Sequence, residues 1–484
     1  MQIVYSTDVE QYTVFEVSYT GSQVANPFTD TQLSATFMYK NKRYTAEGFY
    51  DGNGIYKIRF MPDQLGEWTY NTSSNDKNLN GKTGTFICTK ASKGNHGPVR
   101  VRDTFHFGYD DGTPFFPIGT TAYAWVWQGD TLVKQTLETL SKSPFNKIRM
   151  TIMPKNYDVF INTEPFCYPF EGSKQKGWDF YRPNPQYWQY FEDKVFQLMK
   201  LGIEADIILY HPYDNNKWGF DKANPEQNLF YLRYAIARLS AYRNVWWSLS
   251  NEYDIMGKPN EEWQKYGNTL LTLDPVQHLR SIHNGMAWYN HAEPWVTHLS
   301  IQTAFLQDIQ KWRVTYQKPV VIDECVYEGN VATDWGNLTA EEMVNRFWIT
   351  WCRGGYCTHG ETYTHPKNIL WWSKGGKLYG KSPERLAFMY KIMADAPTTG
   401  LTPLHTVWNK ETYLYKDKDY VLYYIGNSQQ SGARLYLSDK ANYKVEIIDV
   451  WNMTITQAQG TFTGNVEVPL PGKPYIAVRA VKIK

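Results

Sequence analysis

The sequence predicts a multidomain α/β plus β protein, with a TIM-type (β/α)8 barrel between an N-terminal and a C-terminal β-sandwich. The chain has 484 residues, more than one hydrophobic core usually supports. Its central part alternates apolar strands with amphipathic helices, the pattern of parallel βαβ units. Both ends show short period-2 runs, which indicate half-buried strands. We therefore expect domains at residues 1–95 (immunoglobulin-like), 96–400 (barrel) and 401–484 (second sandwich).

The N-terminal domain is expected to be all β. Residues 14–19, 33–39 and 55–60 alternate apolar and polar side chains. Turn signals separate these runs, as in the Asp-Gly-Asn-Gly sequence at 51–54. The polar segment 91–98, which contains glycine and proline, then joins this domain to the barrel.

Eight apolar runs predict the strands of the barrel, the number that closes this fold. Between them, Asn184-Pro185 and Asn224-Pro225 each place proline directly after an N-cap residue, which predicts a helix start. Thr339 and Glu342 have the spacing of a capping box before a further helix. The expected strands are residues 115–119, 147–152, 204–210, 245–249, 279–282, 297–301, 320–322 and 356–359.

Beyond residue 400 the period-2 pattern returns, and no helical periodicity accompanies it. It predicts a second, smaller β-sandwich that follows the barrel. The expected strands are residues 420–425, 433–437, 443–450, 465–468 and 475–480.

Two glutamates, Glu252 and Glu324, follow the fourth and seventh expected barrel strands. Barrels of this type keep their catalytic acids just beyond the carboxyl ends of the strands. Cleavage of a glycoside needs one carboxyl group to protonate the leaving oxygen and another beside the anomeric carbon. The pair therefore predicts a glycosidase. The alternative is that both are buried, ion-paired core acids, which would require two separate costly burials.

Other polar and aromatic residues gather at the same strand ends. Apolar neighbours could raise the pKa of Glu252, while Arg149 and Tyr327 could keep Glu324 ionised. Tryptophans near the rim could stack on a sugar ring, although such residues also pack in cores. The candidate substrate-binding residues are Asn251, Arg149, His211, Asp214, Tyr123, Trp125, Trp218, His283, His298, Gln302, Tyr327, His359, Trp371 and Trp372.

The histidines show none of the spacings typical of a metal site, so we expect no metal and no cofactor. Asp254, Glu328 and Glu361 are the competing carboxylates, each either functional or a member of a buried ion pair.

Composition limits the partners. Fifty basic and 48 acidic residues, with no basic run, argue against nucleic acid, and no apolar segment reaches 18 residues, which argues against a membrane. The five cysteines lack metal-ligand spacing and are expected to be reduced. The first residues show no leader pattern, which predicts a cytoplasmic protein, or a secreted or periplasmic one if a leader was removed. Assembly into a homo-oligomer stays open.

Several segments resemble a known group, the clan A glycoside hydrolases, whose retaining barrels carry an Asn-Glu acid/base after strand four and a glutamate nucleophile after strand seven. Asn251-Glu252 and Glu324 match that pattern. More narrowly, the chain is similar to apiosidase-like barrels that carry a β-sandwich on each side. The segments that carry this similarity begin at Phe115 (FFPIGTTAYAW), Tyr210 (YHPYD), Ser281 (SIHNG), Trp295 (WVTHLSIQ), Pro319 (PVVIDECVYEG) and Gly355 (GYCTHGETY).

The resemblance implies a glycoside hydrolase that acts on plant or microbial polysaccharide or oligosaccharide. It does not imply apiose as the sugar, because apiosidases proper carry an aspartate-containing segment where this chain has residues 250–254 (SNEYD). We expect cleavage of a β-glycosidic bond by a two-carboxylate retaining mechanism, with exo action because long rim segments (156–182 and 358–380) could close the barrel mouth. The alternatives are an endo-acting glycanase of the same barrel type and a non-catalytic protein that binds carbohydrate or matrix.

Overall fold

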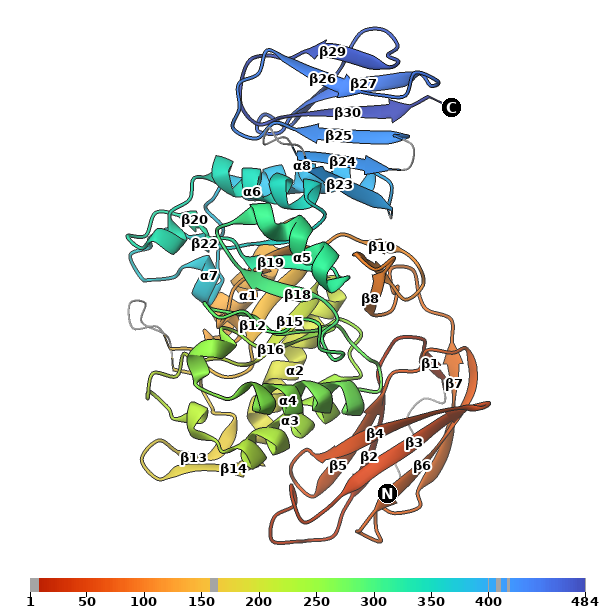
Figure 1. The fold of residues 1–484 in the computed structure, drawn as a ribbon. Coiled ribbons are helices and arrows are strands. Elements are labelled where there is room, and N and C mark those ends of the chain that lie inside the picture. The colour runs from red at the N-terminus through yellow and green to blue at the C-terminus, as the bar shows by residue number, and fades with distance from the viewer. Residues whose placement is uncertain (1–7, 157–163, 399, 406–410, 416–417, 484) are drawn as a thin grey trace.

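The computed structural model describes residues 8–156, 164–398, 400–405, 411–415 and 418–483. In Figure 1 a helix-covered barrel occupies the middle of the molecule, with one group of β-strands near the N-terminus and another near the C-terminus. The predicted β-rich ends and α/β centre are therefore confirmed. The domain boundaries, and the description of the two ends as sandwiches, stay predictions.

Eight strands form the central parallel sheet, in the order β17-β16-β15-β12-β11-β21-β19-β18. A parallel bridge between His283 and Ser300 connects the two end strands, so the sheet is nearly closed. The strands are β11 (Ile118–Thr121), β12 (Lys147–Thr151), β15 (Glu204–Tyr210), β16 (Val245–Ser250), β17 (Arg280–Ser281), β18 (Leu299–Gln302), β19 (Val320–Glu324) and β21 (Tyr356–His359).

The first barrel strand differs from its prediction. Residues 115–119 were expected, whereas β11 begins at Ile118. Pro114 and Phe115 instead form β10, which pairs antiparallel with β9 (His106–Tyr109). Pro117 separates the two strands, because proline has no N–H to donate to a sheet. Together with β8 (Val99–Arg102), these strands form a small three-stranded sheet that precedes the barrel.

The helices of the barrel begin where their capping residues predict. Asn184 accepts a hydrogen bond from the Gln186 amide, and Asn224 forms a full capping box with Gln227. Thr339 also caps its helix, but the Glu342 carboxylate bonds to Arg346. The helices are α1 (Asp130–Leu140), α2 (Pro185–Lys200), α3 (Pro225–Leu239), α4 (Asn260–Leu273), α5 (Ile309–Tyr316), α6 (Ala340–Cys352), α7 (Trp371–Lys374) and α8 (Ser382–Ala394).

Short elements decorate the loops between barrel strands and helices. Two short strand pairs are present, β13 (Phe170–Ser173) with β14 (Gly177–Pro183) and β20 (Glu328–Gly329) with β22 (Glu361–Thr362). The single-turn helices are η1 (Trp125–Trp127), η2 (Phe220–Lys222), η3 (Tyr253–Met256), η4 (Leu306–Asp308) and η5 (Asp334–Gly336).

The N-terminal strands form a seven-stranded sheet in the order β1-β7-β6-β3-β4-β5-β2. Its aromatic core includes Phe37 stacked on Phe60 at a centroid distance of 4.2 Å. The sheet contacts the barrel through Arg59, whose guanidinium bonds to Glu192 at 2.8 and 2.9 Å. The strands are β1 (Asp8–Glu10), β2 (Phe15–Thr20), β3 (Leu33–Tyr39), β4 (Lys42–Tyr50), β5 (Ile55–Phe60), β6 (Gly66–Ser74) and β7 (Thr83–Thr89).

The C-terminal strands form a six-stranded sheet, in the order β23-β24-β25-β30-β27-β28, and a separate β26-β29 pair. They contact helix α6 of the barrel, where the Tyr424 hydroxyl donates to Asn345 at 2.8 Å. The strands are β23 (Leu401–His405), β24 (Glu411–Tyr415), β25 (Tyr420–Tyr424), β26 (Gly432–Tyr436), β27 (Tyr443–Asp449), β28 (Thr454–Gln457), β29 (Asn465–Pro469) and β30 (Ile476–Lys482).

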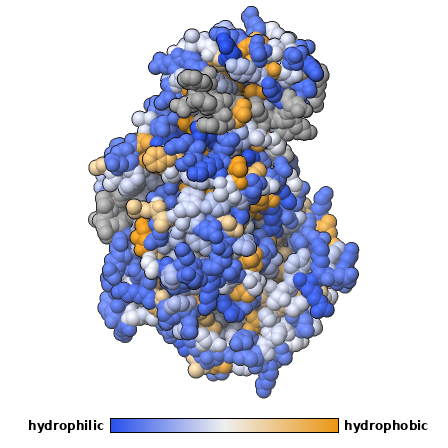
Figure 2. Space-filling view, in the orientation of Figure 1, coloured by the Kyte–Doolittle hydropathy of each residue, from blue (hydrophilic) through white to orange (hydrophobic). Residues whose placement is uncertain are grey.

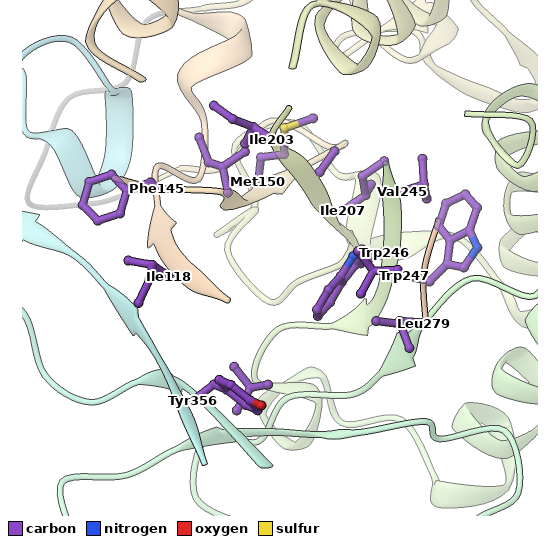
Figure 3. Close-up of a cluster of buried hydrophobic side chains, with 14 of the residues drawn as sticks. Ile118, Phe145, Met150, Ile203, Ile207, Val245, Trp246, Trp247, Leu279 and Tyr356 are labelled. Atoms are coloured by element: carbon purple, nitrogen blue, oxygen red, sulfur yellow. The ribbon is translucent and has the colours of Figure 1, made fainter. Parts of the chain in front are cut away.

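The main hydrophobic core lies within and around the barrel, and the N- and C-terminal strands have separate cores. All seven residues of β15 are buried, as expected for a parallel strand covered on both faces. Figure 3 shows buried side chains from several barrel strands, including Met150, Ile207, Trp246 and Tyr356. Inside the barrel, Lys147 bonds to Asp206 and Asp323, which come from two other strands. The barrel interior is therefore packed with side chains, and chemistry can take place only at its ends.

The visible face in Figure 2 is mostly hydrophilic, with hydrophobic side chains scattered over it. Among the described residues, no helix combines the length and apolar character needed to cross a membrane. The five cysteines are all free thiols, as predicted.

Candidate active site

Glu252 lies directly beyond the carboxyl end of β16. Its backbone adopts the left-handed conformation (φ 44°, ψ 55°), which is rare for a residue with a side chain and costs roughly 1–3 kcal/mol. The side chain is 9% exposed. Burial, and then the negative charge of Glu324, raise the pKa of Glu252 to about 7. A carboxyl group with this pKa can hold a proton near neutral pH and can donate it.

Glu324 ends strand β19 and lies beside Gln302 of β18. The Tyr123 hydroxyl donates a hydrogen bond to its Oε1, and His283 Nε2 lies 3.4 Å from the same oxygen. Burial alone would raise the pKa of Glu324. The hydrogen bond with His283 and the positive charges of Arg149 and Lys155 outweigh burial and lower this pKa to about 2. Glu324 is therefore ionised at neutral pH.

Asn251 and Arg149 form a buried pair next to the two glutamates. Arg149 Nη2 donates to Asn251 Oδ1 at 2.9 Å, and this bond fixes the orientation of the amide. Asn251 Nδ2 has no hydrogen-bond partner within the described part of the chain, although Asn251 is 1% exposed. A buried donor without a partner is costly, so Nδ2 is suited to bind a ligand oxygen.

Lys155 faces both glutamates. The sequence places it among the polar residues at the strand ends but assigns it no role. Its ammonium lies 3.5 Å from the centre of the Tyr123 ring and 3.8 Å from that of Tyr213. Burial lowers the pKa of Lys155 to about 7, against the charges of Glu324 and Glu252, which raise it. Lys155 follows β12 by four residues, which agrees with the rule that places functional residues beyond the strand ends.

Charges deeper in the barrel form a paired network. Lys147 bonds to Asp206 at 2.7 Å and to Asp323 at 2.8 Å. Arg149 lies 3.9 and 3.8 Å from the same two carboxylates. Asp206 and Asp323 therefore already balance Lys147 and Arg149. The charge of Lys155 balances that of Glu324. The net charge of these groups is therefore zero when Glu252 is protonated, which agrees with the raised pKa of Glu252.

The structure brings several other predicted residues to the glutamates. His283 Nε2 lies 3.3 Å from the Gln302 side-chain oxygen, and a Gln302 hydrogen bond acts to lower the pKa of Glu252. Tyr327 lies beside Glu324. Burial raises the pKa of the Tyr327 phenol, and the negative charge of Glu324 raises it further. The Trp372 ring packs 6.1 Å from that of Tyr327. These residues form a wall of the candidate site.

Two predicted residues have their polar groups engaged near the site. The Asp214 carboxylate accepts hydrogen bonds from three consecutive backbone amides, residues 218–220, and so shapes the loop after β15. His211 Nε2 lies 3.2 Å from the Met153 carbonyl oxygen, and burial lowers the pKa of His211 to about 4. Asp214 acts on the loop backbone, so we leave it out of the proposed substrate-binding set.

Other predicted residues lie in the core. Trp125 is fully buried, with Nε1 3.4 Å from the Met150 sulfur. Trp218 is 5% exposed and its indole N–H donates to Glu164, while Trp371 donates to Thr120. None of these three has an open ring face for stacking on a sugar, so we leave them out of the proposed set.

Two histidines are also left out. His298 precedes β18 and packs against Phe107 and Trp246 at the amino end of the barrel, opposite the glutamates. His359 has no exposed surface, stacks on Phe145 and lies 3.1 Å from the Thr120 hydroxyl oxygen.

The competing carboxylate Asp254 accepts backbone hydrogen bonds from residues 285, 286 and 287 at 2.6–2.8 Å. Burial acts to raise its pKa, but these amides outweigh it and lower the pKa, so Asp254 holds the loop after β17. Glu328 and Glu361 lie together in a separate buried cluster with His359.

Comparisons with known families agree with this geometry. A model described as the apiosidase-like catalytic domain matches residues 102–414. Two further models, both domains of unknown function (DUF5060 and DUF5605), match residues 8–75 and 408–481. No curated protein matches the chain.

Solved structures extend the likeness. A crystal structure from Bacteroides vulgatus ATCC 8482, classed as a candidate glycoside hydrolase, is 38% identical to this chain, with a TM-score of 0.92. The match covers 98% of this chain and 100% of that one. A family 5 glycoside hydrolase from the same organism matches at 13% identity and a TM-score of 0.63, over 80% of this chain and 94% of that one. The second match shows a shared fold alone.

Proposed function

Because the chain belongs to the apiosidase-like family, we propose that it hydrolyses glycosidic bonds with Glu252 as the acid/base and Glu324 as the nucleophile of a retaining mechanism. The observation that carries this proposal is the opposite displacement of the two pKa values, to about 7 for Glu252 and about 2 for Glu324. Two carboxyl groups whose environments separate their pKa values are the expected signature of an acid paired with a nucleophile.

In the first step, protonated Glu252 gives its proton to the glycosidic oxygen as the Glu324 carboxylate attacks the anomeric carbon. The carbon–oxygen bond to the leaving group breaks, and a covalent glycosyl ester with Glu324 forms. In the second step, ionised Glu252 takes a proton from water as that water attacks the anomeric carbon and releases Glu324. The Tyr123 hydroxyl and His283 hold Glu324 in place before the attack.

Asn251 is proposed to bind a sugar hydroxyl beside the anomeric carbon. Its Oδ1 is held by Arg149, which leaves Nδ2 to donate to the substrate. A hydrogen bond to the 2-hydroxyl that strengthens in the transition state contributes to catalysis in glycosidases. Tyr327 and Trp372 pack against each other on the same wall, are only 2% and 5% exposed, and so shape the site without an open ring face.

We extend the proposal to β-linked oligosaccharides or polysaccharides of plant or microbial origin and to exo action. The β-linkage rests on the pattern of the retaining clan A barrels. Exo action rests on the long rim segments, of which residues 157–163 lie outside the described residues.

The test is hydrolysis of aryl α- and β-glycosides of xylose, galactose, glucose, arabinose, fucose and apiose by the wild type, Glu324→Gln and Glu252→Gln. We expect activity on a β-glycoside and its near-complete loss in Glu324→Gln. With an activated substrate, Glu252→Ala should recover turnover in azide and release a β-glycosyl azide. Glu384→Gln is a matched control, because Glu384 lies on the surface with its side chain 76% exposed.

Proton NMR of the first-formed sugar decides the stereochemistry. Release of the β-anomer supports retention, whereas the α-anomer from a β-glycoside would mean inversion and would make Glu324 a base. If no glycoside is cleaved but sugar polymers bind, the protein is a carbohydrate-binding protein and the proposal fails.

A further inference from the structure

A second cluster of ionisable side chains lies behind the candidate active site, where β20 and β22 pair. Glu328 and Glu361 face each other in register on these strands, and His359 ends the neighbouring strand β21. One donor atom from each of the three lies within 4.8 Å of the others, and the side chains are 0–1% exposed. The proposed hydrolysis uses none of them.

The two carboxylates are held in place by backbone amides from the segment that leads into α8. Glu361 accepts from Tyr379 N at 2.7 Å and from Gly380 N at 2.8 Å. Glu328 accepts from Lys381 N at 2.9 Å and also from the Ser382 hydroxyl. These hydrogen bonds fix the orientation of both carboxylate groups, while burial, the largest influence, raises the pKa of Glu361 to about 7.

No full positive charge accompanies these carboxylates among the described residues. Within those residues, His359 lies 3.9 Å from Glu328, and neither Glu328 nor Glu361 forms an ion pair with a lysine or an arginine. Two ionised carboxylates buried without a cation would be strongly unfavourable. A cation, or protons, must complete the cluster.

His359 supplies the independent observation that points to a ligand. Its Nδ1 lies 3.1 Å from the Thr120 hydroxyl oxygen, which already accepts a hydrogen bond from the Trp371 indole. Its Nε2 has no hydrogen-bond partner within the described residues, and 3.9 Å to Glu328 is too long for one. If Nδ1–H donates to the Thr120 hydroxyl, Nε2 presents a free lone pair to the carboxylates, which is the usual arrangement of a metal-binding histidine.

We propose that Glu328, His359 and Glu361 bind one divalent transition-metal ion, of the class of Zn²⁺ or Mn²⁺, as a structural site. One imidazole nitrogen with carboxylate oxygens suits such ions better than Ca²⁺ or Mg²⁺, which prefer oxygen ligands alone. Ligands about 2.1 Å from a tetrahedral ion are about 3.4 Å apart. The donor atoms, which lie within 4.8 Å of one another, would therefore close by up to about 1.4 Å on binding.

The position of the cluster indicates what the ion would do. Tyr327 immediately precedes Glu328, and its ring packs so closely on Gly360, between His359 and Glu361, that a Cβ on that glycine would lie 2.0 Å from a ring carbon. Fixing the two strands would therefore fix Tyr327, which faces Glu324. The ion would hold a wall of the candidate active site without contacting substrate.

The experiment is metal analysis of the full-length protein, by elemental mass spectrometry after purification and after dialysis against dipicolinate followed by one equivalent of Zn²⁺ or Mn²⁺. We expect one bound ion per chain, a Tm that falls on chelation and recovers on readdition, and X-ray absorption with nitrogen and oxygen ligands, including one imidazole. His359→Gln and Glu361→Gln should lose the ion. His298→Gln is the control, because His298 is equally buried but faces aromatic rings.

Two results would overturn the proposal. If the wild type binds neither ion and its Tm does not change, the cluster is completed by protons. If an ion binds but is retained by both His359→Gln and Glu361→Gln, it lies elsewhere. Metal content and the absorption spectrum of the wild type do not depend on hydrolysis or on the folding of variants, so this test can fail while the proposed function holds.

Discussion

The two ends of the barrel contain the same kinds of charged residue but differ in how those residues are paired. Towards the amino end, Lys147 bonds to both Asp206 and Asp323, and all three are buried. At the carboxyl end, Glu252 and Glu324 share Lys155 and compete for charge, so their pKa values are pushed apart. Complete pairing stabilises a fold, whereas incomplete pairing leaves a group able to exchange a proton.

The largest expected effect comes from removing Lys147, which pairs with Asp206 and Asp323 towards the amino end of the barrel. Lys147→Met leaves two buried carboxylates with Arg149 alone, and we expect a loss of about 3–5 kcal/mol in the free energy of unfolding. Urea denaturation measures this loss. Lys142→Met, at an exposed position, should change it by less than about 0.5 kcal/mol. A small effect at Lys147 would mean that Arg149 alone balances both carboxylates.

The next prediction weakens the support of the nucleophile. Tyr123→Phe removes the hydroxyl that donates to Glu324, and a hydrogen bond to a charged group is worth about 1.5–3 kcal/mol. We expect kcat/KM to fall by about 10- to 150-fold, and the acidic limb of its pH profile to move to higher pH, because the pKa of Glu324 rises. Tyr289→Phe, a buried tyrosine that bonds to Gln264, should leave the profile unchanged. An unmoved acidic limb would contradict the role of Tyr123.

A third prediction concerns stability and pH. The folded-state pKa of Glu252 is raised from 4.5 to about 7, so the folded protein is destabilised progressively as pH rises from about 4.5 to about 7. Glu252→Gln removes this titration and should raise Tm more at pH 8 than at pH 5, by a difference worth about 1–3 kcal/mol. Calorimetry across this range measures it. An equal gain at both pH values would place the pKa of Glu252 near its ordinary value.

The smallest expected effect concerns Lys155, which lies beside the two glutamates at the carboxyl end of the barrel. Lys155 acts to lower the pKa of Glu252, so Lys155→Met should raise that pKa and move the basic limb of kcat/KM to higher pH, by about one unit or less. Lys217→Met is the matched control, because Lys217 also lies over an aromatic ring but pairs with Glu164. Loss of the basic limb in Lys155→Met would show that Lys155, and not Glu252, titrates there.

Much of the fold could be predicted from the chain. The expected strands at residues 204–210 and 356–359 coincide with β15 and β21, because buried parallel strands are continuous apolar runs. The positions of Glu252 and Glu324 after their strands followed from the same pattern. The apolar pattern predicts a strand at residues 279–282, but β17 spans only Arg280–Ser281.

The candidate site was harder to predict in detail. His298 was placed with the rim because it lies within an expected strand, although it precedes β18 and so lies at the opposite end of the barrel. Trp125 and Trp371 have the composition of a stacking platform, yet both are almost completely buried. Lys155 follows the second strand among the other polar residues at the strand ends, but its neighbouring sequence does not indicate that it faces two carboxylates.

The sequence by itself determined the alternation of strands and helices, the β-rich ends and the two glutamates at strand ends, because each is encoded in local spacing. The tertiary structure alone decided which glutamate holds a proton. Tyr123, Lys155 and His283 follow three different barrel strands, β11, β12 and β17, and they reach Glu324 only when the barrel closes. A pKa depends on burial and on distances to charges, and these distances exist only in the folded chain.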